Sequence, residues 1–109
     1  MQIAPGVFAS SIHTVDWEPD AEVGGDVHVL CTGVGVDAGI SRITEPPASP
    51  LSYQAKGRET LLILEGGAKI EIEGGPTLNL KVGDMASIPA GAKTTWHFTT
   101  PFKELWVIA

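Results

Sequence analysis

An alternation of apolar and polar residues is clearest in the segment AKIEIEGG. Ile70 and Ile72 share one face of this segment, whereas Lys69, Glu71 and Glu73 share the other. Successive side chains of a β-strand point to opposite sides, so this two-residue period predicts a half-buried strand. The glycine pairs on either side of it, in LEGG and IEGG, are typical of turns, and we expect a hairpin there.

Similar strand patterns recur along the rest of the chain at intervals of about 8–12 residues, with turn residues between them. No segment has the period of an amphipathic helix. The other predicted strands lie in DVHVLCTGVGV (26–36), AGISRIT (38–44), ETLLILEGG (59–67), PTLNLKVGD (76–84), MASIPAG (85–91), TTWHFTT (94–100) and ELWVIA (104–109). Short recurring strands predict an all-β sandwich or barrel, and both a jelly roll and an immunoglobulin-like sandwich fit the spacing.

Composition and charge narrow the classes of protein further. The chain has 109 residues, which suits one domain, and 43% of them are hydrophobic, as in a globular protein. The net charge of −6 argues against nucleic acid and anionic membrane surfaces as partners. No run has the length of a membrane span, and the N-terminal segment lacks the pattern of a signal peptide, so we expect a cytoplasmic protein.

Cys31 is the only cysteine, and it lies in the apolar run VHVLCTGVGV. A single cysteine excludes an intramolecular disulfide and argues against a cysteine-based zinc site. It also weakens the immunoglobulin-like alternative, because the two sheets of antibody domains are joined by a cysteine pair. We expect a buried, reduced thiol.

Two motifs, in this order, resemble those of the cupin family. In ETLLILEGGAKIEI, Glu59 is followed after six residues by Gly66, and in GDMASIPAG, Gly83 is followed after five residues by Pro89. The resemblance covers residues 30 to 109. It implies a single-domain RmlC-like jelly-roll barrel (a double-stranded β-helix), commonly a homodimer, with a pocket inside the barrel.

Within this resemblance, residues 1–109 form one cupin domain, in which 30–109 are the barrel core and 1–22 are an N-terminal arm or edge strand. The C-terminal stretch PAGAKTTWHFTTPFKELWVIA is similar to the cupin branch that contains ureidoglycine aminohydrolase and the ethanolamine-utilisation cupins. That branch has a tryptophan after the proline-glycine turn and a lysine before the last strand. Trp96 and Lys103 match these positions.

Metal-binding cupins usually hold a divalent ion with two histidines and a glutamate from the first motif and a histidine from the second. The positions that the resemblance assigns to the histidines are Ser52 and Gln54, or Tyr53 and Ala55 in a shorter spacing, and Thr94. Glu59 alone matches the usual set. Because a divalent ion needs three or four converging N or O donors, we expect no cofactor and no histidine-based metal centre. The alternative is a weakly held divalent metal such as Mn, Fe, Ni or Zn.

Two histidines of the chain are candidates to replace the missing ligands. If Trp96 and Phe98 point into the barrel, strand alternation directs His97 outward. His28, on an earlier strand, would be a lone imidazole beside Glu59, and a non-standard site with His28 stays open. Neither histidine completes the usual set.

A pocket without a metal depends on the side chains that line the barrel. The candidate ligand-binding residues are Arg42, Tyr53, Gln54, Glu59, Thr94, Trp96 and Phe98. Glu59 is the candidate catalytic residue, because a carboxyl among apolar walls has a raised pKa that suits a general acid or base. Arg42 is a candidate partner for a ligand carboxylate or for Glu59 itself. We expect Lys103 and Glu104 on a solvated face.

These features support two main functional hypotheses. The first is a non-enzymatic cupin that binds a small polar metabolite inside the barrel. The second is a cupin enzyme of the lyase, isomerase or amidohydrolase type, which acts on a small polar or carboxylate substrate through Glu59. An accessory subunit of a metabolic complex is a third. Leu62 and Leu64 alternate with the inward residues, so an outer apolar face predicts a homodimer.

Overall fold

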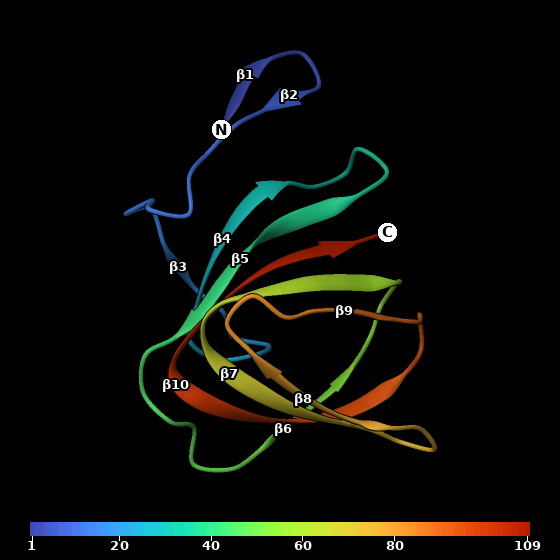
Figure 1. Cartoon of the computed structure of the whole chain (residues 1–109). Coiled ribbons are helices and arrows are strands. Elements are labelled where there is room, and N and C mark those ends of the chain that lie inside the picture. Colours follow the sequence, from blue (N-terminus) through green and yellow to red (C-terminus); the bar gives the residue numbers. More distant parts are fainter.

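Two long antiparallel strands organise the molecule, as Figure 1 shows. The computed structural model describes all 109 residues, and its regular elements are ten β-strands. The strands are β1 (Gln2–Ala4), β2 (Val7–Phe8), β3 (Glu18–Pro19), β4 (Asp26–Cys31), β5 (Asp37–Ile43), β6 (Leu51–Gln54), β7 (Glu59–Ile72), β8 (Thr77–Lys81), β9 (Met85–Ile88) and β10 (Lys93–Ile108). No helix of the length and apolarity needed to span a bilayer is present.

The sheet that contains β7 and β10 has the strand order β3-β4-β5-β10-β7-β8, with β6 also paired to β10 and β9 also paired to β7. All of these pairs are antiparallel. Because β7 and β10 bend along their length, their two halves pair with different neighbours and the sheet wraps around a common interior (Figure 1). The all-β fold expected from the strand spacing is confirmed, and so is the jelly-roll barrel that the cupin resemblance implies.

The glycine pair at 66–67 lies inside β7, so the predicted turn at this point is wrong. Gly66 has a φ of +70°, and a Cβ built on it would lie 2.2 Å from the carbonyl oxygen of Thr99 and 2.3 Å from that of Pro101. The register between β7 and β10 shifts at the same place. Such a bulge bends a strand without ending it, which is how β7 passes from one side of the barrel to the other.

The bulge also changes which residues of β7 face inward. Leu61 and Ile63 are buried before it, whereas Ala68 and Ile70 are buried after it, so the inward positions change from odd to even numbers. The core inside the barrel consists of Ile43, Ala55, Leu61, Ile63, Ala68, Ile70, Ile88, Trp96 and Phe102. Lys69 and the acidic residues of the segment 68–75 are exposed, as the alternation predicts.

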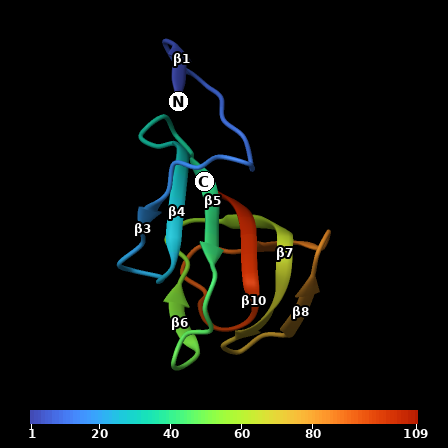
Figure 2. The same cartoon turned by 90° about the vertical axis from the view of Figure 1, so that its left-hand side faces the viewer.

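The N-terminal part of the chain leaves the barrel. The hairpin of β1 and β2 projects away from it in both views (Figures 1 and 2), whereas β3 pairs with β4 and extends the sheet. Strand β4 ends at Cys31, so the segment 32–36, predicted as strand, is a loop. Cys31 is half-buried and free.

Candidate functional site

A cavity with a volume of about 350 Å³ lies inside the barrel. Its walls come from β4, β5, β6, β7 and β10, and the segment 19–23 covers one side. Most of the lining is apolar or aromatic: Val27, Val29, Ile43, Leu51, Trp96, Phe98, Phe102, Trp106 and Ile108. This size and lining are typical of small-molecule pockets, in which a few polar groups orient the ligand.

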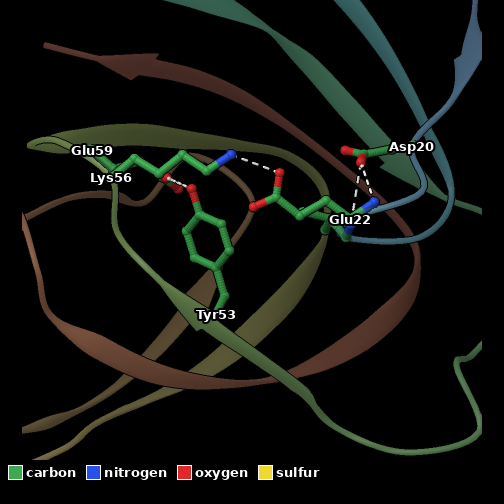
Figure 3. A network of polar contacts seen from close by, with 6 residues as sticks. Asp20, Glu22, Tyr53, Lys56 and Glu59 are labelled. Carbon is green, nitrogen blue, oxygen red and sulfur yellow. Dashed lines mark hydrogen bonds and ion pairs between the residues drawn. The ribbon is translucent and has the colours of Figure 1, made fainter.

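Glu59, the first residue of β7, is one of these polar groups. It is 5% exposed, and its Oε1 accepts a hydrogen bond of 3.0 Å from the hydroxyl of Tyr53 on β6 (Figure 3). Burial raises the pKa of Glu59, and the hydrogen bond from Tyr53 lowers it by a smaller amount. The pKa of Tyr53 is raised, first by burial and then by the charge of Glu59. The direction of the shift at Glu59 agrees with the sequence-based prediction.

Glu104 on β10 is a second buried carboxyl, and its predicted place on a solvated face is wrong. It is 7% exposed, and its Oε2 has no hydrogen-bond partner. Burial, and to a lesser degree the charge of Glu59, raise the pKa of Glu104 well above its ordinary value. The alternation of Phe102, Trp106 and Ile108 would have found it, because Glu104 shares their phase on the strand.

The segment 19–23 is held over the cavity by polar contacts. Lys56 donates a hydrogen bond of 2.7 Å to Oε2 of Glu22, and Oδ1 of Asp20 accepts hydrogen bonds from the backbone N–H groups of Glu22 and Val23 (Figure 3). This contact could not be predicted from the sequence, because residues 22 and 56 lie far apart in the chain and no motif links them.

The predicted aromatic residues line the cavity. Trp96 is buried and stacks on Phe98 with their ring centroids 5.8 Å apart. The indole N–H of Trp96 donates to the hydroxyl of Thr94 at 2.9 Å, and that hydroxyl donates to the backbone carbonyl of Tyr53 at 2.7 Å. Thr94 therefore lies behind the cavity wall and ties β10 to β6.

Gln54 does not reach the cavity. It is exposed, and its side chain donates a hydrogen bond of 3.2 Å to the backbone carbonyl of Gly91. Gln54 and Thr94 instead border a separate, polar surface hollow between β6, β7 and β10. Strand alternation explains the placement of Gln54, because Leu51 and Tyr53 are the β6 residues that line the cavity.

Arg42 lies on the opposite face of β5 from the cavity, which corrects its prediction as a pocket residue. Ser41 and Ile43 line the cavity, so the residue between them points outward. There the Arg42 side chain donates to Asp26 at 2.9 Å, and its guanidinium carbon lies 4.3 Å from the ring centroid of Trp17. Arg42 therefore neither faces a ligand in the cavity nor neutralises Glu59.

The histidines also lie outside the cavity. His28 has Nε2 2.7 Å from the hydroxyl of Ser10 and Nδ1 2.8 Å from the carbonyl oxygen of Asp16, so it binds the N-terminal arm. His97 points outward, as predicted, and forms a hydrogen bond with Glu71.

The donors that face the cavity do not fit the metal site that many cupins carry. Glu59 is the one matching ligand, and no group of three His, Cys, Asp or Glu side chains is arranged to hold a metal ion. Divalent transition metals require three or four converging donors, of which imidazole is the commonest. The cavity is lined by carboxyls, hydroxyls, one phenol, one lysine ammonium group and aromatic rings, and two of the carboxyls, Glu59 and Glu104, are buried.

A bent antiparallel barrel with a pocket inside defines the class of double-stranded β-helix proteins. The chain belongs to the family of the EutQ-like cupin domain, whose family model matches residues 41–104. The cupin resemblance predicted from the two motifs is therefore confirmed. No curated protein is significantly similar to this chain in sequence.

Several solved structures share the fold. An ethanolamine utilization protein Q (EutQ) of Salmonella typhimurium LT2 has a TM-score of 0.79 at 22% identity, over 95% of this chain and 86% of that one. An RmlC-like cupin family protein of Methanocaldococcus jannaschii has a TM-score of 0.66 at 15% identity, over 94% of this chain and 88% of that one. A cupin superfamily protein of Desulfitobacterium hafniense DCB-2 has a TM-score of 0.64 at 20% identity, over 75% of this chain and 73% of that one. At these identities the likeness shows the fold alone.

Proposed function

We propose that this protein is a small-molecule-binding cupin that holds a small polar metabolite inside its barrel. The observation that carries the proposal is the cavity of about 350 Å³, in which apolar walls surround the hydrogen-bonded pair of Tyr53 and Glu59. Apolar walls supply contact area, and a few buried polar groups select the ligand.

A ligand screen with a blocked cavity tests this proposal. Val29 lines the cavity and is 44% exposed, so Val29→Trp adds bulk at the mouth without disturbing the core. We expect a screen of small polar metabolites by thermal shift to find ligands that stabilise the wild type and Val34→Trp but not Val29→Trp. Val34 is a matched control, because it is 52% exposed and lies outside the cavity. Equal binding by both variants would contradict binding inside the barrel.

We further propose that the cavity works without a histidine-based metal centre. The support is the donor set, since His28 and His97 are bound elsewhere and the inward ligands are carboxyls. Elemental analysis of the purified protein tests this. Near-stoichiometric Mn, Fe, Ni or Zn would overturn it and favour the weakly held metal of the alternative hypothesis.

An enzymatic function is the second candidate, and the burial of Glu59 favours it. A buried carboxyl with a raised pKa, held by Tyr53, suits the role of a general acid or base. Such an enzyme would act on a small polar or carboxylate substrate with Glu59 as acid or base. If turnover of a bound ligand is found, Glu59→Gln should abolish it even at saturating ligand, while the protein stays folded. Unchanged turnover would reject this role.

We also propose that the protein is a homodimer. On the outer face of the sheet, Leu62 lies between Leu105 on β10 and Met85 on β9, which forms an apolar row. The projecting hairpin exposes Ile3 and Val7 as well. An apolar face of this kind on a small barrel is typical of a subunit interface. A monomeric mass by light scattering at micromolar concentration would contradict the proposal.

A cytoplasmic location stays a prediction. Its support is the single free Cys31, since a reducing compartment keeps such a thiol intact. Cell fractionation with an antibody against the native protein measures the location directly, and recovery outside the cytoplasm would reject it.

A further inference from the structure

One carboxyl oxygen of Glu104 lacks a hydrogen-bond donor. Its Oε2 is buried without a partner, although buried carboxyl oxygens in proteins are normally bonded. Two donors that line the cavity are already used: the indole N–H of Trp106 donates to the hydroxyl of Ser41 at 2.8 Å, and the hydroxyl of Tyr53 donates to Glu59. A molecule with N–H groups that enters the cavity would supply a donor to Glu104.

The charge around the cavity determines the kind of donor that fits. Its ionisable lining residues are Asp20, Glu22, Asp37, Glu59, Glu104 and Lys56. Lys56, the one cation among them, is bound to Glu22 at 2.7 Å. The lining therefore has five groups that can carry a negative charge against one cation, and low-dielectric walls strengthen the potential of those that are ionised. An anionic ligand is disfavoured there, and a cation is attracted.

The aromatic walls favour the same kind of ligand. The rings of Trp96, Phe98, Phe102 and Trp106 border the space beside the carboxyls. The faces of aromatic rings attract ammonium ions and also pack against aliphatic carbon. Carboxylates and aromatic rings together recognise a small molecule that has a positive head and an apolar body.

We propose that the cavity binds a small organic ammonium ion, whose N–H groups donate to the carboxylates of Glu104 and Glu59 while its carbon chain packs on the aromatic walls. This ligand class rests on the proposed binding function and makes it more specific. Burial raises the pKa of both Glu59 and Glu104, because it disfavours their charged forms. A bound ammonium group would oppose this effect by stabilising the carboxylates.

The test compares ligands that share one carbon chain and differ in the head group: n-butylamine, 1-butanol and butyrate. Dissociation constants are measured by NMR titration of the full chain at neutral pH. We expect the amine to bind about tenfold or more tightly than the alcohol, because its hydrogen bonds involve charged groups. Butyrate should bind most weakly, since it adds a negative charge.

Variants connect the preference to the named residues. Glu104→Gln keeps the shape of the side chain and removes its charge, so it should weaken n-butylamine about tenfold and leave 1-butanol nearly unchanged. Glu59→Gln should act in the same direction, which covers the case that one variant folds poorly. Glu45→Gln is the control, because Glu45 is an exposed residue outside the cavity and its variant should bind like the wild type.

The outcomes separate this proposal from the one on which it rests. Equal or tighter binding of 1-butanol or butyrate would overturn the ammonium ligand and leave small-molecule binding intact. An amine preference that survives in both Glu104→Gln and Glu59→Gln would also overturn it. If none of the three probes binds at tens of millimolar, the ammonium proposal is rejected, and the metabolite screen with Val29→Trp decides the binding function separately.

Discussion

The hydroxyl of Tyr53 on β6 donates a hydrogen bond of 3.0 Å to Oε1 of Glu59, the first residue of β7. The bond joins two strands across the cavity and acts on both titrations. It favours the ionised form of Glu59, whereas burial favours the neutral form, and burial is the larger effect. The strength of the hydrogen bond between Tyr53 and Glu59 therefore depends on whether Glu59 is ionised.

Removal of the Tyr53 hydroxyl should destabilise the protein and make Glu59 harder to ionise. We expect Tyr53→Phe to lower the free energy of unfolding by about 1 kcal/mol and to raise the pKa of Glu59 further, because its one side-chain donor is lost. Urea denaturation and NMR titration measure the two effects. In a Glu59→Gln background the same change should have a smaller effect on stability, and full additivity would argue against the coupling.

The buried carboxyls predict a dependence of stability on pH. The pKa of Glu104 in the folded protein lies above the ordinary value of 4.5, so the folded state holds its proton more tightly than the unfolded chain. Its stabilising contribution is complete below that value and is lost as the pH rises through the folded-state pKa. Each unit of difference corresponds to about 1.4 kcal/mol.

Glu104→Gln removes this titration. The variant should therefore gain stability relative to the wild type as the pH rises above about 4.5. Asp84 has a lowered pKa and acts in the opposite direction in both proteins, so the difference between variant and wild type is the quantity to compare. Glu45→Gln serves as the control and should show no such gain. A difference that does not change with pH would contradict the buried state of Glu104.

A methyl group at the bulge of β7 should be severely destabilising. Gly66→Ala places a Cβ 2.2 Å from the carbonyl oxygen of Thr99 at a φ of +70°, so both a clash and backbone strain oppose it. Gly74→Ala is the matched control, because Gly74 has a φ of +72° and nothing within 4 Å of the added atom. We expect a loss of about 1 kcal/mol for the control and about 3 kcal/mol or more for Gly66→Ala. Equal losses in thermal or chemical unfolding would show that the contact between β7 and β10 relaxes freely.

The ion pair between Lys56 and Glu22 should control the mobility of the segment over the cavity. Lys56→Met keeps the aliphatic stem and removes the charge. We expect a change of less than about 1 kcal/mol in global stability, because the pair is exposed, together with faster hydrogen exchange at Val23 and Gly24. Lys81→Met, which breaks the 3.3 Å pair with Asp84 in a distant turn, should leave that exchange unchanged. If both variants leave Val23 and Gly24 equally protected, the ion pair does not hold the segment.

Part of the cavity could be predicted from strand alternation. Trp96 and Phe98 line it, and His97 faces outward, because the period of two holds wherever a strand is regular. Strand alternation also directs Glu104 inward. It was predicted on a solvated face because it is charged, and its position on the strand was not taken into account. Arg42 was predicted to face inward but faces outward. Alternation alone does not determine which face of β5 is the inner one.

The class of fold, the positions of most strands and the inward carboxyl of Glu59 could all be predicted from the sequence. These depend on local periodicity and on two short motifs, which are properties of neighbouring residues. Three further relations exist only in the folded chain: Gly66 forms a bulge, Glu104 is buried near Glu59, and Glu22 reaches Lys56. Each of these relations joins segments far apart in the chain, and a bulge changes the phase of alternation without any change in composition. Only the closure of the barrel fixes which faces meet inside it.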